Sequence, residues 1–596
     1  MSQRWLLRPH EPERATALAA ALGVHPLIAQ LLLHRGITEA DGANAFMKGT
    51  LNDLHNPEEL PGVVEAAERI VQAVRDGRKV VIYGDYDVDG VCGTSILWAC
   101  LRLAGAHDVD YYIPHRVDEG YGLNGEALRK LAGEVGAKLV VTVDCGISAV
   151  QEARLARDLG LELVITDHHT LGPELPEADV LVHPRLPGSN YPRDAELCGC
   201  GVAFKLAWQI GKSFGDGKKA SPHMRNFLAG AVGLVALATV ADVVPLGGEN
   251  RLLVRAGLQR LWERPSVGMR ALMEVAGLLK NRKLNTGNVG FSLAPRLNAA
   301  GRLERAQDAV RLLTTTDENE ARTLALQLDQ WNQDRQTVEL AILAEARQEI
   351  ENRGGLAERG AIVVGRQGWH AGVIGIVASR LAELYHRPVV LVSLCEGGCQ
   401  GSARSIPGFD LYAAIQSCSE GLLAFGGHEA AAGLKLPHDG FLAWAERFER
   451  HCQGAVPQEL LRRQLLIDAE VRLGELSFKV VDQISALEPH GPGNPRPLLV
   501  VNSVRVCAPP RVVGKNSKHL QLRIEQGGLE LKAIGWNLAE RAAEKLTAGT
   551  VCSLAFYPSI NEWNGRRDVQ LEVRDFQVGE AGSSFEQNPS EPPAGA

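Results

Sequence analysis

Residues 80–90, with the sequence VVIYGDYDVDG, place a short apolar run directly before a loop rich in carboxylates. The run from Val80 to Tyr83 predicts a buried β-strand, and the residues from Val91 to Leu103 predict a helix. A strand followed by a helix is the first half of a βαβ unit, from which parallel sheets covered by helices are built. The stretch therefore predicts an α/β fold that presents three acidic side chains, Asp85, Asp87 and Asp89, at the carboxyl end of a strand.

Four later apolar runs repeat this pattern. They are residues 111–113, 138–143, 163–166 and 180–182, and they stop at or near Pro114, Asp144, Asp167 and His183. Helical patterns separate the runs, so we expect one parallel sheet. Open sheets of this kind bind their ligands beyond the carboxyl ends of the strands. We therefore expect Asp144 and the run Asp167-His168-His169 to lie beside the acidic loop.

Asp242 adds one more carboxylate, directly after an apolar segment from Leu228 to Ala241. Carboxylates gathered at one sheet edge repel each other unless a cation compensates their charge. Two divalent ions would do so, and they would also clamp the attacking and leaving oxygens of a phosphoryl displacement. Carboxylates with one or two imidazoles suit Mn²⁺ or Mg²⁺ better than structural zinc. The expected ligands are Asp85, Asp87, Asp89, Asp144, His168 and Asp242.

A DxD loop alone has a simpler explanation, because Asp caps helices and stabilises tight turns. Neighbouring histidines in a loop are also common without a metal. Three such groups at the ends of successive strands favour a metal site over a set of unrelated turns.

The composition indicates a globular protein with several domains. The chain has 596 residues, of which 45% are hydrophobic and 22% charged. Its net charge of −8 is compatible with a local basic groove that binds nucleic acid. The N-terminal residues lack the apolar core of a signal peptide. The most apolar segment, residues 228–241, is shorter than the roughly 20 residues of a membrane span. The eleven cysteines lack the spacing of a zinc site. We expect reduced thiols and a cytoplasmic protein without membrane association.

Six segments are predicted along the chain. The residues from Glu318 to Arg353 lack Gly and Pro and repeat apolar residues at helical spacing, which predicts one long helix. A second α/β pattern follows, and then short β segments with an Asn564-Gly565 hairpin signal, which predict a small barrel or sandwich. The segments are an N-terminal extension (1–60), a parallel-sheet domain (61–315), the connecting helix (316–355), a smaller α/β domain (356–456), a β-rich domain (462–578) and a disordered tail (579–596).

Four motifs resemble, in order, those of the DHH phosphoesterases: residues 84–90, 143–148, 166–169 and 241–246. Within that superfamily the chain is most similar to the RecJ family of bacterial single-stranded-DNA exonucleases. The resemblance implies a DHH domain joined by the long helix to a smaller DHHA1 domain, followed by an oligonucleotide-binding (OB) barrel. It implies that two metals are bound by Asp87, Asp89, Asp144, His168 and Asp242.

The resemblance also assigns catalytic roles beside the metals. His169 would contact the scissile phosphate, and Asp167 would orient both histidines. Asp85 stands near a position that is a histidine ligand in some relatives, so its role as a ligand stays open.

Expected substrate contacts precede and follow the long helix. In the loop after residues 111–113, an Arg and a Tyr offer phosphate pairing and base stacking. The residues expected in loops before the long helix are Arg116, Tyr121, Asn124, Arg296, Asn298 and Arg302. For Arg296, structural pairing with a neighbouring acid is an almost equal alternative. In the second α/β domain the resemblance points to Ser402, Arg404, Gly426, Gly427 and His428, with Ala403 at a position where the family often has Gly.

The β-rich domain carries a motif and a composition that fit the same family. Residues 488–495 resemble the entry motif of its OB barrel, although His490 stands where an aromatic residue is usual. Charged residues and rings alternate further on, including Arg511, Lys515 and Trp536, and such mixtures bind single strands by pairing and stacking. Each of these residues is equally compatible with a core ring or a solvated charge.

The resemblance implies an exonuclease that acts on single-stranded DNA in the 5′-to-3′ direction, releases 5′-mononucleotides and serves DNA repair and recombination. It would act as a monomer with two Mn²⁺ or Mg²⁺ ions, and a helicase and a single-stranded-DNA-binding protein are possible partners. Two alternatives remain: a small-substrate DHH phosphodiesterase or pyrophosphatase, and a non-catalytic replication scaffold. The sequence contains no Walker P-loop, which argues against an ATP-driven helicase.

Overall fold

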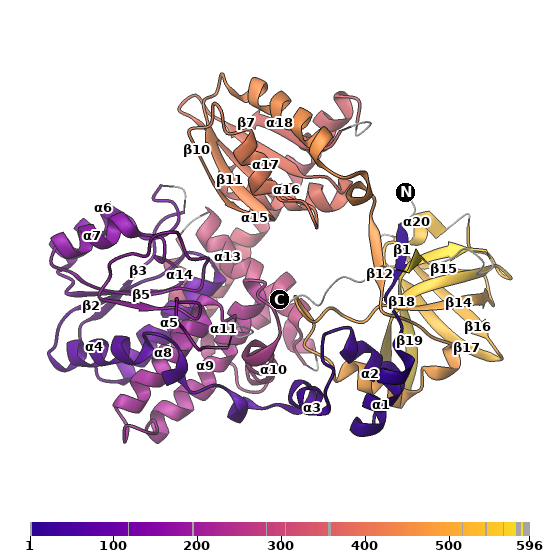
Figure 1. Ribbon diagram of the computed structural model, residues 1–596, viewed down its shortest axis with the longest axis horizontal. Helices are drawn as coiled ribbons and strands as arrows, with labels where there is room; N and C mark the ends of the chain where they lie inside the picture. Colours follow the sequence, from indigo (N-terminus) through magenta and orange to yellow (C-terminus); the bar gives the residue numbers. More distant parts are fainter. Residues whose placement is uncertain are drawn as a thin grey trace. The chain divides into compact units, whose positions relative to one another are not determined.

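A five-stranded parallel sheet forms the centre of the first domain and confirms the predicted α/β architecture (Figure 1). Its strand order is β3-β2-β4-β5-β6, and all neighbouring strands run parallel. The predicted apolar runs coincide closely with β2 (Val80–Tyr83), β3 (Val109–Tyr112), β4 (Leu139–Thr142), β5 (Glu162–Thr166) and β6 (Val180–Val182). Because β2 and β4 are buried throughout, their sequences show no alternation of polar and apolar residues.

Helices cover both faces of this sheet (Figure 1). One face carries α6 (Gly125–Lys130) and α7 (Val150–Asp158), and the other carries α4 (Val63–Arg75), α5 (Val88–Leu103) and α8 (Gly199–Ser213). Helix α5 begins three residues before its predicted start, since the Asp87 side chain accepts a hydrogen bond from the backbone of Asp89 and caps it. The acidic loop is therefore short, and it leads directly from a strand into a helix N-terminus.

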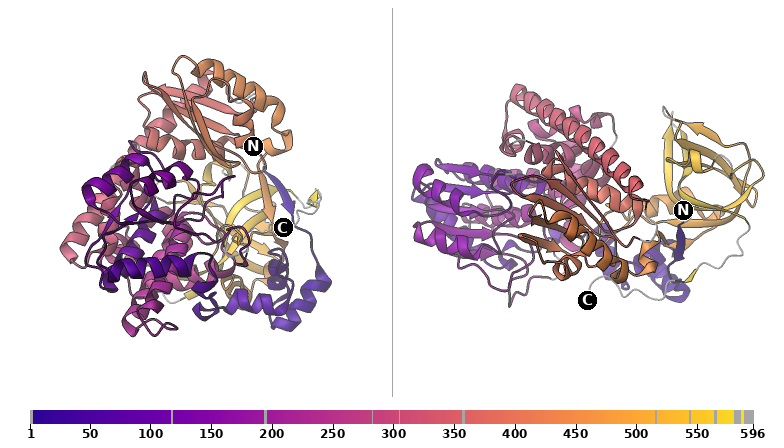
Figure 2. Two further views of the ribbon diagram at one scale, coloured as in Figure 1. Left: turned by 60° about the vertical axis from the view of Figure 1, so that its left-hand side comes forward. Right: turned by 90° about the horizontal axis from the view of Figure 1, so that it is seen from above.

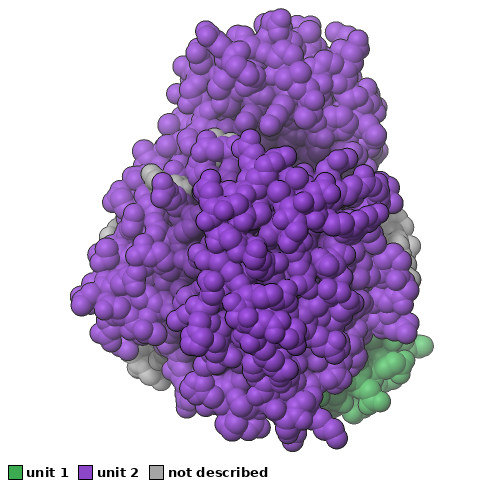
Figure 3. Space-filling view, turned by 90° about the vertical axis from the view of Figure 1, so that its left-hand side faces the viewer, with its two compact units in different colours: residues 1–54, 245–255, 464–596 green, residues 55–244, 256–463 purple. Residues whose placement is uncertain are grey.

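The structure is a computed structural model, which describes residues 3–579 and 586–587 except 117, 193–195, 282, 304, 356–358, 515–516, 543–544 and 564–565. The chain forms two compact units (Figure 3). The larger unit contains residues 55–244 and 256–463, and the smaller contains residues 1–54, 245–255 and 464–596. The six-segment division of the chain stays a prediction.

Helix α9 (Pro222–Ala241) contains the most apolar segment of the sequence. It is 20 residues long, because it begins before the predicted segment, and by length and composition alone it could cross a membrane. More than half of its apolar window, 56%, is buried inside the protein. It packs against α5 and α8, as the core helix of a folded domain does.

The predicted connecting helix is α15 (Glu318–Asn352), a single helix of 35 residues (Figure 2). Asp317 caps its first turn by accepting from the backbone of Asn319 and Glu320, and Gly354 and Gly355 follow its end with positive φ angles. Beyond it lies the second α/β domain, whose sheet has the order β10-β11-β9-β8-β7. Its elements are β7 (Ile362–Gln367), α16 (Ala371–Tyr385), β8 (Val389–Leu394), β9 (Cys399–Arg404), α17 (Leu411–Ser417), β10 (Ala424–His428), β11 (Ala431–Leu436) and α18 (Phe441–Ala455).

The smaller unit contains the predicted β barrel. Seven strands follow the order β13-β14-β18-β19-β17-β16-β15, and a further pairing of β14 with β16 closes the sheet on itself. The hairpin signal is confirmed by the antiparallel pair β18–β19, although residues 564–565 themselves lie outside the described residues. The strands are β13 (Ala469–Glu470), β14 (Leu499–Val506), β15 (Arg511–Val513), β16 (His519–Gln526), β17 (Leu529–Gly535), β18 (Val551–Trp563) and β19 (Arg566–Val578).

The N-terminal residues share the core of this barrel. Helices α1 (Pro12–Leu22) and α2 (Pro26–Leu33) bury their apolar residues in one cluster with strands β14, β16 and β18. Strand β1 (Arg4–Leu7) pairs in parallel with β12 (Gln464–Ile467) and with β20 (Glu586–Gln587). Of the predicted disordered tail only Gly579 and β20 are described.

Residues 488–495, which resemble the entry motif of the OB barrel, contain the fully buried Asn494. This side chain connects the motif to Arg35, which follows α2. Its amide donates to the carbonyls of Leu487 and Pro489, and its oxygen accepts from Arg35 at 2.6 Å.

Candidate metal centre

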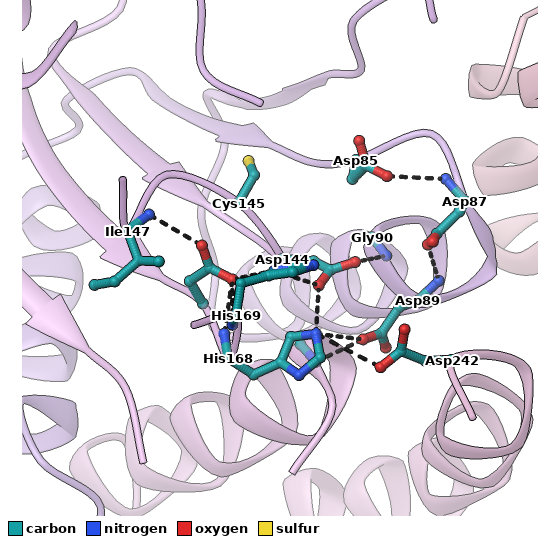
Figure 4. Close-up of polar contacts among 12 residues, drawn as sticks. Asp85, Asp87, Asp89, Gly90, Asp144, Cys145, Ile147, His168, His169 and Asp242 are labelled. Carbon is teal, nitrogen blue, oxygen red and sulfur yellow. Dashed lines mark hydrogen bonds and ion pairs between the residues drawn. The ribbon is translucent and has the colours of Figure 1, made fainter. Parts of the chain in front are cut away.

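Seven of the expected site side chains converge at the carboxyl edge of the parallel sheet (Figure 4). The ligand atoms form three overlapping groups, and within each group they all lie within 4.8 Å of one another. The groups are Asp85, Asp87 and Asp144; Asp89, His168 and Asp242; and Asp144, His168 and His169. Nε2 of His168 lies 3.2 Å from Asp144, 3.6 Å from Asp242 and 3.8 Å from Asp89. The loops after three strands and the end of α9 therefore contribute to one cluster.

Backbone amides hold the buried carboxylates in place. Asp89 accepts from the N–H groups of Gly199 (2.6 Å) and Cys200 (2.9 Å), which form the N-terminus of α8. Asp144 accepts from Gly90, at the start of α5, at 2.9 Å. Helix N-termini carry partial positive charge and unpaired N–H groups, so both contacts favour carboxylate anions.

Close backbone approach and strain also mark this site. A Cβ atom on Gly199 would lie 2.5 Å from the Asp144 carboxylate, so any larger residue would fill the space beside it. Asp144 itself adopts a left-handed backbone with φ of 65°, and its backbone N–H donates a hydrogen bond to the carbonyl oxygen of Thr166. A non-glycine residue in this region stores about 1–3 kcal/mol of strain, which concentrates at functional sites.

The cluster carries more negative charge than its protein surroundings compensate. Burial, and then the neighbouring carboxylates, raise the pKa of Asp89 to about 7 and that of Asp242 to about 9. The same causes raise the pKa values of Asp85 and Asp144 well above the ordinary range. The buried atoms Asp85 Oδ1, Asp144 Oδ1, His168 Nε2 and Asp242 Oδ2 lack hydrogen-bond partners among the described residues. Oxygen and imidazole donors that are buried, converging and unpaired fit hard divalent cations.

Asp167 and His169 form an ion pair at the side of this cluster. Nδ1 of His169 lies 2.7 Å from the Asp167 carboxylate, which also accepts from the backbone amides of Ile147, His168 and His169. Although burial opposes charge on both groups, the hydrogen bond and the opposite charge lower the pKa of Asp167 to about 2 and raise that of His169 to about 9. Burial lowers the pKa of His168 to about 3, so this imidazole is neutral and free to donate a lone pair.

Tyr121 contacts the histidine of this ion pair. Its hydroxyl lies 3.2 Å from the His169 ring nitrogens and donates to the backbone oxygen of Asp144 at 3.2 Å. A cavity of about 320 Å³ opens beside them, and His428 of β10 also lines it. Asn124 is not among the residues that line this cavity. Its side chain caps the N-terminus of α6, and its amide group donates a hydrogen bond to the Tyr83 hydroxyl.

Three arginines gather near the cluster without acidic partners. Arg116 stacks on the Tyr86 ring, Arg302 donates to the backbone of Gly372, and Arg404 donates to Ser402 at 3.1 Å. Burial, and then the other arginines, lower the pKa of Arg302 to about 9. None of the three forms an ion pair within the described part of the chain. Arg116 acts electrostatically on Asp85, and Asp87 acts on Arg302. Guanidinium groups without an ion-pair partner are suited to binding an anion.

The expected loop that carries Arg296, Asn298 and Arg302 is a helix, which corrects the prediction. These residues belong to α13 (Ala294–Leu303), preceded by a π-helical turn at Val289–Leu293. Pro295 and Gly301 suggested a loop, but Pro is tolerated in a first helical turn, and Gly301 allows the helix to approach Tyr86. Asn298 accepts from the backbone of Val88 at 3.0 Å.

Arg296 makes the structural pairing that the sequence left as an alternative. Its guanidinium lies 2.8 Å from the Asp329 carboxylate of α15. Ser402 of β9 and Gly426 and Gly427 of β10 lie on the two strands that flank β11, with Gly426 and Ser402 both level with Gly433 of β11.

Sequence reasoning missed several residues that shape the site. Gly375 of α16 lies so close to Ser402 and Arg404 that its Cβ would be 2.9 Å from the serine hydroxyl. The backbone N–H groups of Gly199 and Cys200 bind the Asp89 carboxylate. Both residues belong to a Cys-Gly-Cys run in the sequence, and this run could have been considered as the start of a helix. All eleven cysteines are free, and nine of them are buried, as expected.

Three family models match the chain. The DHH family N-terminal domain matches residues 79–239, the DHHA1 domain residues 358–453, and the RecJ OB domain residues 467–575. The single-stranded-DNA-specific exonuclease RecJ of Bacillus subtilis is 38% identical over 97% of this chain and 71% of its own length. The protein of that name from Escherichia coli is 35% identical over 96% of this chain and 99% of its own.

A solved structure extends the similarity to the fold. The crystal structure of RecJ in complex with Mn²⁺ from Thermus thermophilus covers 97% of this chain, with a TM-score of 0.80 and 32% identity. The similarity includes 80% of the residues in that crystallised chain. A second structure of the same protein, in complex with Mg²⁺, gives a TM-score of 0.75.

Proposed function

The chain belongs to the RecJ family of single-stranded-DNA-specific exonucleases in the DHH superfamily, and from this premise we propose that it degrades single-stranded DNA from the 5′ end with two divalent cations. The observation that carries the proposal is the combination of two features in the larger unit. One is the cluster of buried, unpaired carboxylates and His168, and the other is the nearby group of unpaired arginines.

Asp85, Asp87, Asp89, Asp144, His168 and Asp242 would hold the two cations, for which Mn²⁺ and Mg²⁺ fit the donor set. When bound, such ions polarise a phosphate and stabilise the charge that develops on its oxygens. Relatives crystallised with Mn²⁺ and with Mg²⁺ support this choice.

His169 would contribute a positive charge to the reaction. Its pKa of about 9 keeps the imidazole protonated at neutral pH, and Asp167 fixes its orientation through the 2.7 Å contact. A protonated imidazole at the edge of the cluster can donate to a non-bridging oxygen of the scissile phosphate. The Tyr121 hydroxyl contacts the imidazole ring of His169 and would limit its rotation.

Arg116, Arg302, Ser402 and Arg404 would form the pocket for a terminal phosphate. We propose that one nucleotide lies between this pocket and the metal site, so that each cut releases one 5′-mononucleotide. Guanidinium groups without acidic partners bind phosphate oxygens strongly, often in bidentate geometry. The 5′-to-3′ direction comes from the family resemblance, and a terminal 5′-phosphate in this pocket would agree with it.

The OB barrel of the smaller unit would bind single-stranded DNA. Exposed residues of the barrel include Trp536, whose ring lies 4.8 Å from that of His519, and Arg511. Rings and cations of this type bind single strands by stacking and backbone pairing. We further propose a cytoplasmic monomer active in DNA repair and recombination, with a helicase and a single-stranded-DNA-binding protein as candidate partners.

Comparing three substrates tests the proposal: 5′-phosphorylated single-stranded DNA, the same strand with a 5′-hydroxyl, and pyrophosphate. We expect the phosphorylated strand to be preferred, and Arg404→Met to reduce this preference about tenfold or more, as loss of a charge-assisted contact would. Arg366→Met is the matched control, because Arg366 is an exposed arginine of the same domain. Turnover of pyrophosphate alone would favour the small-substrate alternative, and no turnover with any metal would favour the scaffold.

A further inference from the structure

The loop that follows β6 holds the backbone of the two site histidines. His183 is the first residue of this loop, and its side chain is fully buried, with 0% exposure. Its Nε2 lies 2.8 Å from the carbonyl oxygen of His169. Because a carbonyl oxygen only accepts hydrogen bonds, Nε2 must carry the hydrogen. Nδ1 accepts from the backbone N–H of Arg185 at 3.0 Å, which selects the same tautomer.

Arg185 makes the equivalent contact to the preceding residue. Its guanidinium donates to the carbonyl oxygen of His168 at 3.2 Å and lies 3.6 Å from the Glu196 carboxylate. Pro184 stands between the two contacting residues and restricts the loop backbone. The first three residues of this loop, 183–185, therefore hold both carbonyl groups of the His168-His169 dipeptide.

The amide side of the same dipeptide is held by a different residue. Asp167 accepts from the N–H groups of His168 (2.7 Å) and His169 (3.1 Å). With its N–H groups bound to Asp167 and its carbonyl groups bound to the loop after β6, the dipeptide has little freedom to rotate its peptide planes. Such rotation would redirect the Cα–Cβ bonds and move both imidazole rings.

We propose that His183 and Arg185 are positioning residues that aim the His168 imidazole at the metal cluster and thereby set the affinity for divalent cations. His168 Nε2 must stay within a few ångströms of three carboxylates at once, and ligands generally require placement within about 0.5 Å. The proposal rests on the assignment of His168 as a ligand in the proposed function. It extends that assignment to two residues outside the proposed set of ligands.

A purely structural role makes a different prediction. If the loop only satisfies buried polar groups, its loss will lower the stability of the protein and leave metal affinity unchanged. Metal affinity of the folded, metal-free protein is therefore the readout that separates the two roles. Binding of Mn²⁺ to full-length protein can be measured by isothermal titration calorimetry and by the loss of the free Mn²⁺ electron-paramagnetic-resonance signal.

His183→Phe removes the donor and keeps a ring, whereas His183→Gln keeps an N–H donor. We expect His183→Phe to weaken Mn²⁺ binding about tenfold, the lower end of the effect of losing an outer partner of a metal ligand, because His183 contacts the residue next to the ligand His168. His183→Gln should recover most of the affinity. His107→Phe, at an exposed histidine, is the matched control. Mn²⁺ affinity of folded His183→Phe within twofold of wild type would overturn the proposal, and so would a glutamine variant as weak as the phenylalanine variant.

Arg185→Met provides a second test if His183→Phe does not fold, because the Arg185 side chain is about half exposed. We expect a smaller loss of Mn²⁺ affinity, and unchanged affinity would overturn the proposal. His168→Ala separates this inference from its premise. If His168→Ala binds Mn²⁺ normally, the ligand assignment fails; if it loses affinity while the loop variants do not, only the positioning role fails.

Discussion

Replacing Asp89 by Asn should stabilise the metal-free protein. The Asp89 carboxylate is 1% exposed, and burial, followed by the charge of Asp87, raises its pKa from 3.8 to about 7. A carboxyl group whose pKa is raised by folding stabilises the fold only while it is protonated. Its contribution is lost as the pH rises from about 4, where the unfolded chain ionises, to about 7. The difference in pKa corresponds to about 4 kcal/mol at pH 8, at about 1.4 kcal/mol per pH unit.

The substitution removes this cost but weakens two hydrogen bonds. The amide oxygen of Asn can still accept from Gly199 and Cys200, which donate to Asp89 at 2.6 and 2.9 Å. Loss of the charge on the acceptor weakens these hydrogen bonds and lowers the gain in stability by about 1–2 kcal/mol. The net expectation is a gain of about 2–3 kcal/mol at pH 8 and a smaller gain of about 1–2 kcal/mol at pH 5, where the folded carboxyl group is largely protonated and only the unfolded one is ionised.

Thermal and urea unfolding of EDTA-treated protein at pH 5 and pH 8 measures this gain. Mn²⁺ should stabilise the wild type at pH 8 and have little effect on Asp89→Asn, because ligands stabilise the state that binds them. Glu134→Gln, at an exposed carboxylate, controls for the general effect of removing a negative charge. The reasoning is refuted if metal-free Asp89→Asn is less stable than wild type at pH 8, or if Mn²⁺ stabilises both equally.

Tyr121→Phe removes the hydroxyl that contacts His169 and should lower kcat about tenfold with little change in KM, as loss of one neutral hydrogen bond predicts; equal kcat in steady-state assays would exclude this contact from catalysis. Mn²⁺ affinity should rise at least about tenfold from pH 6 to pH 8, because the raised pKa values of Asp89 and Asp242 require the metal to displace protons; calorimetry that finds no proton release would contradict this. Trp536→Ala and Arg511→Ala should raise KM for long strands and leave kcat unchanged; unaltered KM would remove the barrel surface from the mechanism.

The sheet and its ligands could be predicted because the relevant signals are local. Each buried strand is a short apolar run, and the residue that follows it stands at the sheet edge whatever the rest of the chain does. Asp144 and His168 were therefore identifiable from their positions alone. The long helix was equally accessible, since Asp317 and Gly354 mark its two ends in the sequence.

The remaining features depend on contacts between distant segments. The helix that carries Arg302 contains Pro and Gly, which favour a loop unless packing against Tyr86 is known. The N-terminal residues read as an extension, because nothing local shows that Arg35 bonds to Asn494 in the barrel. His183 stood in the sequence only as a residue after a strand, and its contact with the His169 carbonyl became visible only in the structure.

The central claim is that this chain removes nucleotides from the 5′ end of single-stranded DNA at a metal site containing Asp89. Its most direct test is a time course with strands labelled at the 5′ or the 3′ end, with Mn²⁺ or Mg²⁺, for the wild type and Asp89→Ala. We predict that the 5′ label appears in mononucleotides from the first time point, that the 3′ label stays on progressively shorter strands, and that the variant is inactive. Early release of the 3′ label, internal fragments, or substantial hydrolysis by Asp89→Ala would contradict the claim.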